Sequence, residues 1–126
     1  MIKSQSLLKI VDNSGAKNVK CIKVKNKSHH KAASLGDIIV VSIQTLKQQY
    51  KSSVKINKSE IYKAVVVQTK SFSKQIDGRL IRFGINSAVL INSKKKIIGT
   101  RISTVLPRQL RKSKWSKLGV LSKGFI

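Results

Sequence analysis

Acidic residues are scarce in this sequence: four Asp and Glu stand against 27 Lys and Arg in 126 residues, a formal net charge of +23. A compact fold with such a charge repels itself unless a polyanionic partner neutralises it. General acid–base catalysis needs titratable groups held close together, and the acids lie far apart in the sequence, at Asp12, Asp37, Glu60 and Asp77. The composition therefore indicates a polyanion-binding protein, and we expect no enzymatic activity and no catalytic residue.

The positions of the acids favour a structural role. Asp12 and Asp77 occur in turn-forming stretches, where a carboxylate accepts hydrogen bonds from nearby backbone N–H groups. We expect this role for both residues. The alternative is an acidic site assembled in three dimensions, which an RNA-processing enzyme would require.

Long apolar runs and paired cysteines are also missing. Apolar runs such as Ile38–Val41 reach only four residues, whereas a membrane span needs about 20, so we expect no membrane partner. The single cysteine, Cys21, has apolar neighbours and is predicted to be a small buried hydrophobe rather than a reactive thiol or metal ligand. The N-terminus has neither the apolar block of a secretory signal nor the Arg-rich character of an import peptide, so no cleaved leader is expected.

Motifs for metal and cofactor binding are absent as well. Two adjacent histidines, His29 and His30, lack the spacing and the companion Cys or carboxylate residues of a zinc site. We interpret them as RNA-facing stackers or donors in preference to metal ligands. The sequence contains no phosphate-binding loop and no nucleophile motif. We therefore expect no metal and no cofactor.

Aromatic residues number only six, namely three Phe, two Tyr and one Trp. A surface that captures single strands by stacking needs several exposed rings on one sheet. Phe83 is expected to be buried on its strand, and Trp115 to dock a helix. Phe72 lies in a basic turn, where its ring either faces RNA or folds back over the protein. The balance favours folded RNA recognised by shape and backbone over single-strand capture.

The hydrophobic pattern indicates an all-β fold. Short runs rich in β-branched residues alternate with Gly, Asn and Asp turn signals, and no strand–helix–strand rhythm is present. Short connections between strands favour a small closed antiparallel barrel, which leaves no open edges. The predicted strands are Leu7–Asp12, Val19–Val24, Asp37–Thr45, Ile61–Lys70, Arg79–Phe83 and Ser87–Ile91.

The pattern changes near the C-terminus. Pro107 suits the first turn of a helix, and Arg108–Lys117 is predicted to form one short basic helix with Leu110 and Leu118 on its apolar side. From Gly78 to the end the chain has twelve cations and no acid. Arginine forks match phosphate oxygens, so the best phosphate ligands are expected at Arg82, Arg101, Arg108 and Arg111.

A long, spaced pattern in the second half of the chain resembles the signature of the universal family of large-subunit ribosomal protein 14. It consists of Ala64–Val67, nine residues, Asp77-Gly78, four residues, Phe83, two residues, Asn86, two residues and Val89-Leu90. The resemblance extends almost end to end, through the segments Asp12–Ala16, Cys21–Val24, Gly36–Ile39, Ile81–Phe83 and Gly99–Ile102.

This resemblance implies a five-stranded β-barrel with a projecting β-ribbon and short C-terminal helices. The whole chain would form one ribosomal protein domain, with the barrel over about residues 1–102 and the helical segment over about 103–126. Such a protein is a structural constituent of the large ribosomal subunit. It binds large-subunit rRNA, contacts the large-subunit proteins 3 and 19, meets small-subunit rRNA at an intersubunit bridge, and in some members receives a ribosome-silencing factor.

The basic loops and the resemblance together predict the binding residues. The residues expected to bind RNA are Asn13, Ser14, Lys17, His29, His30, Lys31, Lys47, Lys51, Lys55, Lys70, Lys74, Arg79, Arg82, Arg108 and Arg111. By position match, the residues expected at the intersubunit face are Thr100, Arg101 and Lys117.

Two departures from the family pattern affect the expected structure. The family usually has Gly-Pro-Val shortly after the position of Ile102, whereas this chain has Ser103–Pro107, which puts the start of the C-terminal helix in question. The common Lys-Lys-Gly-Asp turn is replaced by Asn57–Glu60, so a glycine-dependent turn is expected to change its geometry there.

The strong bias toward Lys, Ser, Ile and Asn is typical of an A+T-rich coding sequence. Together with the expected absence of a leader, it favours a mitochondrial matrix ribosome, with a bacterial cytoplasmic or plastid ribosome as the alternative. Two rival functions, a free RNA-chaperoning barrel and an RNA-processing enzyme, are kept for comparison.

Overall fold

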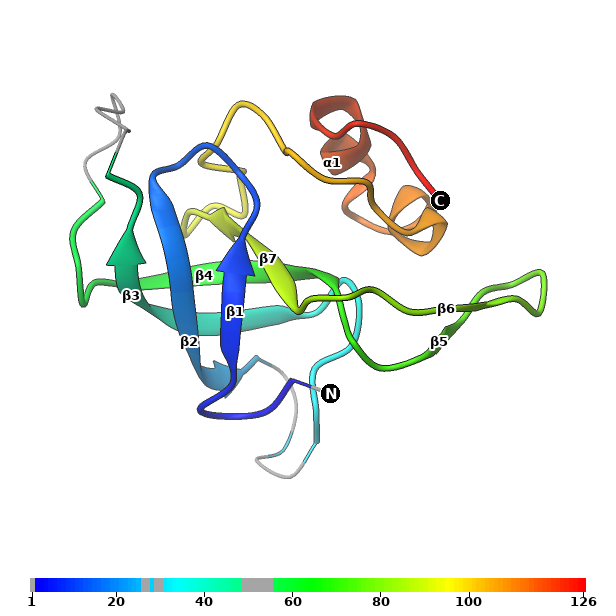
Figure 1. Ribbon diagram of the computed structural model, residues 1–126, viewed down its shortest axis with the longest axis horizontal. Coiled ribbons are helices and arrows are strands. Elements are labelled where there is room, and N and C mark those ends of the chain that lie inside the picture. Colours follow the sequence, from blue (N-terminus) through cyan, green and yellow to red (C-terminus); the bar gives the residue numbers. More distant parts are fainter. Residues whose placement is uncertain (1, 26–27, 29–30, 49–55) are drawn as a thin grey trace.

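The computed structural model describes residues 2–25, 28, 31–48 and 56–126, and its centre is a closed β-barrel (Figure 1). The barrel strands, in spatial order, are β1 (Leu7–Ile10), β2 (Ala16–Val24), β3 (Ile38–Leu46), β4 (Ile61–Gln68) and β7 (Ser87–Ile91). The predicted closed all-β barrel is confirmed.

One pair of strands differs from the purely antiparallel arrangement that the pattern suggested. Strands β1 and β7 close the barrel in parallel, with Lys9 opposite Ser87 and Ile10 opposite Ala88, whereas the other four barrel pairs are antiparallel. Strands that alternate in direction around a ring of odd number must leave one parallel pair. The parallel closure is therefore a geometric consequence of having five strands.

Two apolar clusters lie on opposite sides of the sheet. The first fills the barrel and includes Leu8, Val19, Ile39 and Leu90. The second lies outside the barrel, between strands β4 and β7 and the C-terminal segment. All five residues of β7 are buried, because one face of this strand points into the barrel and the other is covered. Strands covered on both faces have continuous rather than alternating apolar runs.

Strands β5 (Ser73–Lys74) and β6 (Leu80–Ile81) form a separate two-stranded ribbon that projects away from the barrel (Figure 1). The projecting ribbon implied by the family resemblance is thus confirmed. The strand predicted at Arg79–Phe83 shrinks to two residues and lies outside the barrel, and Phe83 is half-buried rather than buried. The two strands of the ribbon pair at Ser73–Ile81 and Lys74–Leu80, and side-chain hydrogen bonds from Gln109 attach the ribbon to the C-terminal segment.

The single predicted C-terminal helix was wrong. The structure has a 3-10 turn, η1 (Arg108–Lys112), and a short helix, α1 (Ser116–Leu121). Ser113 is extended between them, and Trp115 then enters the outer cluster and donates its indole N–H to the carbonyl oxygen of Gly36 at 2.9 Å. This contact holds the break in place.

Burial of the side chains expected to dock this segment is confirmed. Leu110 and Leu118 are 1% and 0% exposed, and Trp115 is 8% exposed. Each fully buried Leu contributes roughly 1.5–3 kcal/mol relative to an exposed one. The tail then returns along Leu106, since the backbone N–H groups of Leu106 and Ile126 donate to Gly124 and Leu106 at 3.0 and 2.8 Å.

Cys21 is buried in the barrel, as predicted, and burial raises the pKa of its thiol. A buried thiol with a raised pKa is a poor nucleophile because little thiolate forms. Among the described residues, no helix has the length and apolar character required to cross a membrane.

Candidate nucleic-acid interface

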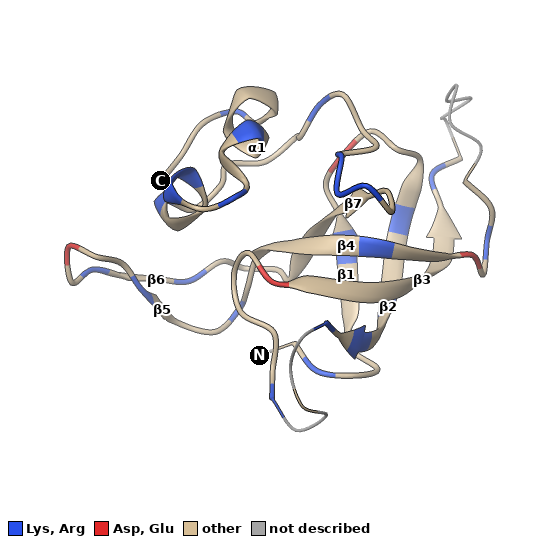
Figure 2. Ribbon diagram, turned by 180° about the vertical axis from the view of Figure 1, so that it is seen from behind, with Lys and Arg blue, Asp and Glu red and all other residues tan. Residues whose placement is uncertain are grey.

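Positive charge covers the barrel, the ribbon and the C-terminal segment, and acidic positions are few (Figure 2). Most of the acids are used in local hydrogen bonds. Asp37 accepts from the backbone N–H and hydroxyl of Ser34 at 2.7 and 2.9 Å. Asp77 accepts from the backbone N–H of Arg79 at 3.1 Å and forms an exposed ion pair with its side chain at 3.4 Å. The turn-forming role predicted for Asp77 is confirmed.

Asp12 forms a buried carboxylate site at the end of β1. One oxygen accepts from the backbone N–H of Ser14 at 3.0 Å and from the Ser14 hydroxyl, and the other accepts from the backbone N–H of Leu90 at 3.0 Å. Burial raises the pKa of the Asp12 carboxyl, although these hydrogen bonds and the charge of Lys47 act in the opposite direction. The predicted turn-forming role is confirmed, and the contact with Leu90 adds a link to β7.

Next to Asp12, the side chain of Asn13 connects the turn after β1 to the segment at Thr100 and Arg101. Its amide oxygen accepts from the backbone N–H groups of Thr100 and Arg101 at 2.7 and 3.2 Å, and its amide nitrogen donates to the Thr100 hydroxyl at 2.8 Å. The ammonium group of Lys47 donates to the carbonyl oxygen of Asp12 at 2.9 Å. Residues predicted separately as RNA-binding and as intersubunit therefore meet in one place.

We call this place the Asn13 cluster: Asn13, Lys47, Thr100, Arg101 and Lys123. A hollow of about 400 Å³ is lined by four of them, with Thr100 beside it. Ser14 was also expected to bind RNA, but its side chain is only 2% exposed and points to Asp12. It shapes the turn and offers no surface hydroxyl.

A second concave surface, the ribbon groove, lies between the β5–β6 ribbon and η1. It encloses about 700 Å³ and is lined by Arg108, Arg111 and Lys112 together with ribbon residues 75–77. The side chain of Gln109 connects the two walls, donating to the carbonyl oxygen of Lys74 at 2.6 Å and accepting from the Ser73 hydroxyl at 3.1 Å. The predicted arginines of the C-terminal segment thus face the ribbon that carries Lys74 and Arg79.

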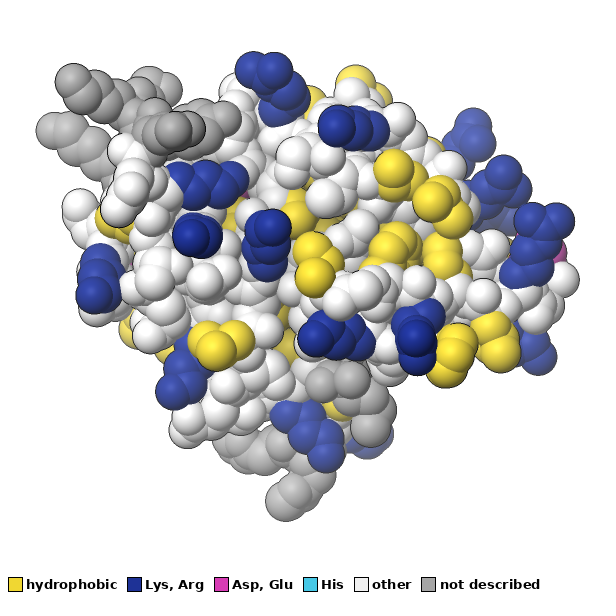
Figure 3. Space-filling model, in the orientation of Figure 1, with side chains coloured by type: hydrophobic (Ala, Val, Ile, Leu, Met, Phe, Trp, Pro, Cys, Tyr) yellow, Lys and Arg dark blue, Asp and Glu magenta, His cyan; other side chains and the backbone are white. Residues whose placement is uncertain are grey.

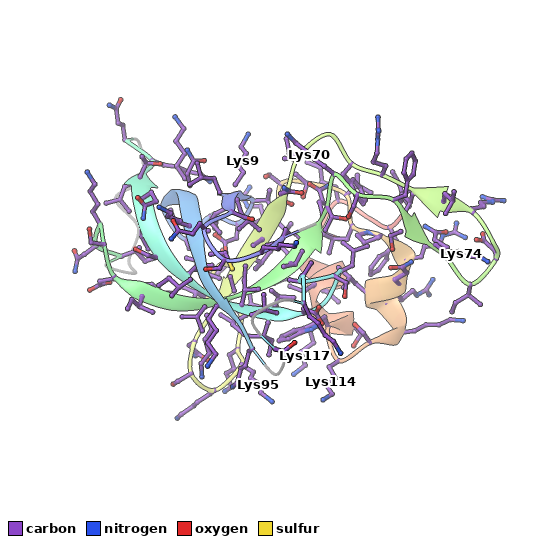
Figure 4. All side chains as sticks on the ribbon, turned by 90° about the horizontal axis from the view of Figure 1, so that it is seen from below. Lys9, Lys70, Lys74, Lys95, Lys114 and Lys117 are labelled. Atoms are coloured by element: carbon purple, nitrogen blue, oxygen red, sulfur yellow. The ribbon has the colours of Figure 1, made fainter. Side chains whose placement is uncertain are left out.

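A third concave surface, the Trp115 groove, was not predicted. It encloses about 770 Å³ between the Gly36 turn and the C-terminal segment, and its cations are Lys25, Lys95, Lys112 and Lys114. Figure 4 shows Lys95, Lys114 and Lys117 gathered on one side of the molecule. The run Lys94–Lys96 could have indicated this basic groove in the sequence. The docking of Trp115 on Gly36 could not have been predicted locally, because the two residues are 79 positions apart.

On the opposite side, Lys9 and Lys70 lie together in Figure 4. Asn86 holds both backbones, since the N–H of Lys9 donates to its carbonyl oxygen at 3.0 Å and the N–H of Lys70 donates to its side-chain oxygen at 2.9 Å. Lys70 was predicted to bind RNA, whereas Lys9 was not predicted because nothing in its local sequence distinguishes it from other exposed lysines.

The remaining predicted residues fall outside these surfaces. Lys17 and Lys31 are exposed but line none of the grooves. Four others, His29, His30, Lys51 and Lys55, lie outside the described residues. In the described part of the chain, no group of three or more His, Cys, Asp and Glu side chains is placed to hold a metal ion.

The fold and its concave surfaces define a basic β-barrel protein. Comparison with known proteins identifies the family to which this protein belongs. The sequence matches the family described as Ribosomal protein L14p/L23e over residues 1–126. It is 43% identical over 126 residues to the large ribosomal subunit protein uL14 of Carsonella ruddii (strain PV), with 100% of both chains covered. The chain belongs to the ribosomal protein L14p/L23e family, a structural class rather than an enzyme class.

Proposed function

We propose that the chain is a structural protein of the large ribosomal subunit and binds large-subunit rRNA through its grooves. Family membership and the name of the Carsonella relative support the assembly. The observation that carries the binding mode is the ribbon groove, where Arg108, Arg111 and Lys112 line one concave surface beside the ribbon. Bidentate arginines at fixed positions suit phosphates of a folded backbone.

The remaining exposed cations are proposed to increase the affinity for RNA without fixing the orientation of its phosphates. Neutralising phosphates releases the counterions condensed on the RNA, and the binding free energy gained in this way depends steeply on salt concentration. We propose this role for the exposed predicted cations Lys17, Lys31, Lys70, Lys74 and Arg79, and for Lys9, Lys95 and Lys114. The predicted His29, His30, Lys51 and Lys55 stay part of the proposed RNA-binding surface on sequence grounds alone.

The whole chain works as one domain in this proposal. The outer apolar cluster contains barrel residues such as Val65 and Val89 together with Leu110, Trp115 and Leu118 from the C-terminal segment. Separating the segment beyond about residue 102 from the barrel would expose this cluster to water. The segment is therefore a rigid wall of the grooves.

The intersubunit face is proposed at the Asn13 cluster and the adjoining helix. Thr100 and Arg101 are exposed, and the backbone N–H of Ile102 donates to the carbonyl oxygen of Leu121 at 2.9 Å. This bond places Thr100 and Arg101 beside α1, which carries Lys117. The proposed partners of this face are small-subunit rRNA and a ribosome-silencing factor, and the large-subunit proteins 3 and 19 are proposed as neighbours elsewhere on the surface.

Three locations are candidates for this ribosome. The amino-acid bias favours a mitochondrial matrix ribosome, whereas the relative from Carsonella ruddii is bacterial and supports the bacterial cytoplasmic alternative. A plastid ribosome is the third candidate. Immunodetection in fractionated host cells distinguishes them.

The assembly is tested by sedimentation. A tagged copy expressed in its own host should migrate with the large subunit through a gradient at high salt. A free RNA chaperone would instead stay near the top of the gradient and bind unstructured RNA as tightly as folded rRNA, and that result would refute the proposal.

A further inference from the structure

Phe72 is an exposed aromatic ring on a protein that has few aromatics. It is 66% exposed, whereas Trp115 is buried and Tyr62 and Phe125 pack against the two apolar clusters. Phe83 is half-buried. Among the described residues, Phe72 therefore offers the most open aromatic face.

The guanidinium of Arg82 lies over this ring. Its central carbon is 5.1 Å from the ring centroid, which is within the range of a cation–π contact. Arg82 is itself exposed and forms no ion pair with an acid in the described part of the chain. One face of the Phe72 ring is covered by a cation, and the remainder of the ring is open to a partner.

The backbone holds the two residues opposite each other. Ser73 pairs with Ile81 in the antiparallel ribbon. Phe72 and Arg82, the next residues outward, therefore lie across from each other at the end of this pairing. Just beyond, the backbone N–H of Phe83 donates to the carbonyl oxygen of Thr69 at 3.0 Å. The backbones that carry the ring and the guanidinium are thus held opposite each other before any ligand arrives, which lowers the ordering cost of binding.

The surrounding charge selects an anionic partner. The segment from residue 68 to 83 carries Lys70, Lys74, Arg79 and Arg82 against Asp77, so its formal charge is 4 − 1 = +3. The single acid is already paired with Arg79 near the turn of the ribbon. Figure 3 shows Lys and Arg side chains interleaved with apolar ones along the projecting ribbon. An apolar surface edged by cations suits an aromatic base attached to a phosphate backbone.

We propose that Phe72 and Arg82 form a stacking platform for one unpaired base of large-subunit rRNA. The proposal rests on the proposed function and adds a specific contact to it. The base stacks on the open part of the Phe72 ring, the Arg82 guanidinium supports the ring from its other side, and Lys70 and Lys74 face the flanking phosphates. Recognition by stacking is tolerant of base identity, because every base has a π face.

The test measures binding of the full-length protein to large-subunit rRNA transcribed in vitro. Phe72→Leu keeps an apolar side chain and removes the ring, and it should weaken binding about 5- to 150-fold, the fold-change that corresponds to about 1–3 kcal/mol. Phe72→Trp should restore binding. The salt dependence of affinity should be unchanged in both variants, because neither alters a charge.

The matched control is Leu7→Ala, which shortens a 65% exposed apolar residue on β1 that lines none of the three concave surfaces and should leave binding unchanged. Thermal unfolding of each variant checks the fold, since neither Phe72 nor Leu7 belongs to an apolar cluster.

The outcomes separate the platform from the general function. If Phe72→Leu binds rRNA as tightly as the wild type while charge-removing variants of the ribbon groove lose affinity, the stacking platform is overturned. The proposed rRNA binding itself would still stand. Unchanged rRNA binding combined with lost binding to a neighbouring ribosomal protein would assign Phe72 to a protein contact instead. Failure of the wild-type chain to bind rRNA would overturn the proposed function itself.

Discussion

The side chain of Asn13 holds the backbone of Thr100, 87 residues further along the chain, at 2.7 Å. The same amide oxygen accepts from Arg101 at 3.2 Å, and the amide nitrogen donates to the Thr100 hydroxyl at 2.8 Å. The orientation of the exposed Arg101 side chain therefore depends on an interior turn at the end of β1. A surface residue proposed to meet RNA is positioned by a residue whose own side-chain donors and acceptors face the protein.

Replacing Asn13 should disturb this surface. Asn13→Ala removes three hydrogen bonds that are worth about 0.5–1.5 kcal/mol each when partly exposed. We expect a loss of about 1.5–4.5 kcal/mol in the free energy of unfolding, measured by urea denaturation. Thr45→Ala, at the exposed end of β3, is the control and should change little. Equal stability of Asn13→Ala and the wild type would contradict the positioning role.

Gly99 tests the same contact by steric means. A Cβ at this position would lie 2.8 Å from the Asn13 amide oxygen and 2.9 Å from the Asp12 Cβ, closer than real Cβ contacts. Gly99→Ala should destabilise the fold by about 1–3 kcal/mol, the usual cost of overpacking. Gly84→Ala meets nothing within 4 Å and serves as the matched control. If Gly99→Ala and Gly84→Ala unfold at the same urea concentration, the close packing of Gly99 against Asn13 and Asp12 does not limit stability.

The buried carboxylate of Asp12 gives a pH dependence with a definite sign. Burial raises its pKa in the folded state above the ordinary value of 3.8, so the folded protein holds this proton more tightly than the unfolded chain. The stability that this group contributes is present below the unfolded pKa and is lost as pH rises through the raised folded pKa.

Asp12→Asn isolates this effect. The N–H groups of Ser14 and Leu90 bond to different oxygens of the Asp12 carboxylate, and an amide replaces one of these oxygens with an NH2 donor, so one buried N–H loses its acceptor at a cost of about 1–3 kcal/mol. The stability advantage of the wild type over Asp12→Asn should shrink as pH rises from about 3 to about 7. Urea denaturation across this range measures it. An advantage that grows with pH would mean that the folded-state pKa is lowered instead.

Ser59 occupies a position where glycine is favoured. Its φ is +67°, and the sequence comparison with the family pattern places a glycine at this point of the turn. Ser59 thus adopts the left-handed backbone that glycine favours, and the expected change of turn geometry stays a prediction. Asn57 and Glu60 close the turn, with the backbone N–H and side-chain amide of Asn57 donating to the Glu60 carboxylate at 3.2 and 3.0 Å.

Ser59→Gly should therefore raise the free energy of unfolding by about 0.5–1 kcal/mol, because relief of the left-handed backbone exceeds the extra entropy of glycine in the unfolded chain. Ser93→Gly is the control, because Ser93 does not have a positive φ, and it should be neutral or destabilising. Destabilisation by Ser59→Gly would show that the serine side chain, rather than the backbone, governs this turn.

The barrel was predictable from the sequence because its strands have short β-branched runs separated by turn signals. The division of the C-terminal segment into η1 and α1 was not predictable, because the break at Ser113 depends on the contact of Trp115 with Gly36, 79 residues away. The same limit applies to the site. Asn13 and Arg101 were assigned to different partners because their contact across 88 residues leaves no mark in the local sequence.

Burial also changed what individual residues can do. Ser14 was expected on the RNA side because the family resemblance places its turn near RNA, but its hydroxyl is used by Asp12 in the interior. Arg108 and Arg111 were expected because the arginine fork matches phosphate oxygens, and the structure adds the ribbon that faces them. Local composition thus located the cations, and tertiary contacts decide which of them share a surface.

The most direct test of the account is the salt dependence of binding to folded large-subunit rRNA. If six to ten phosphates are neutralised, affinity should fall by about 10³- to 10⁵-fold between about 50 and 200 mM salt. Replacing both Arg108 and Arg111 by Gln should weaken binding and reduce the log–log slope by about 2, whereas Lys23→Gln, outside the three grooves, should reduce it by less than about 1. A slope near zero for the wild type, or equal slopes for the wild type and the double arginine variant, would contradict the claim that these grooves bind rRNA through its phosphates.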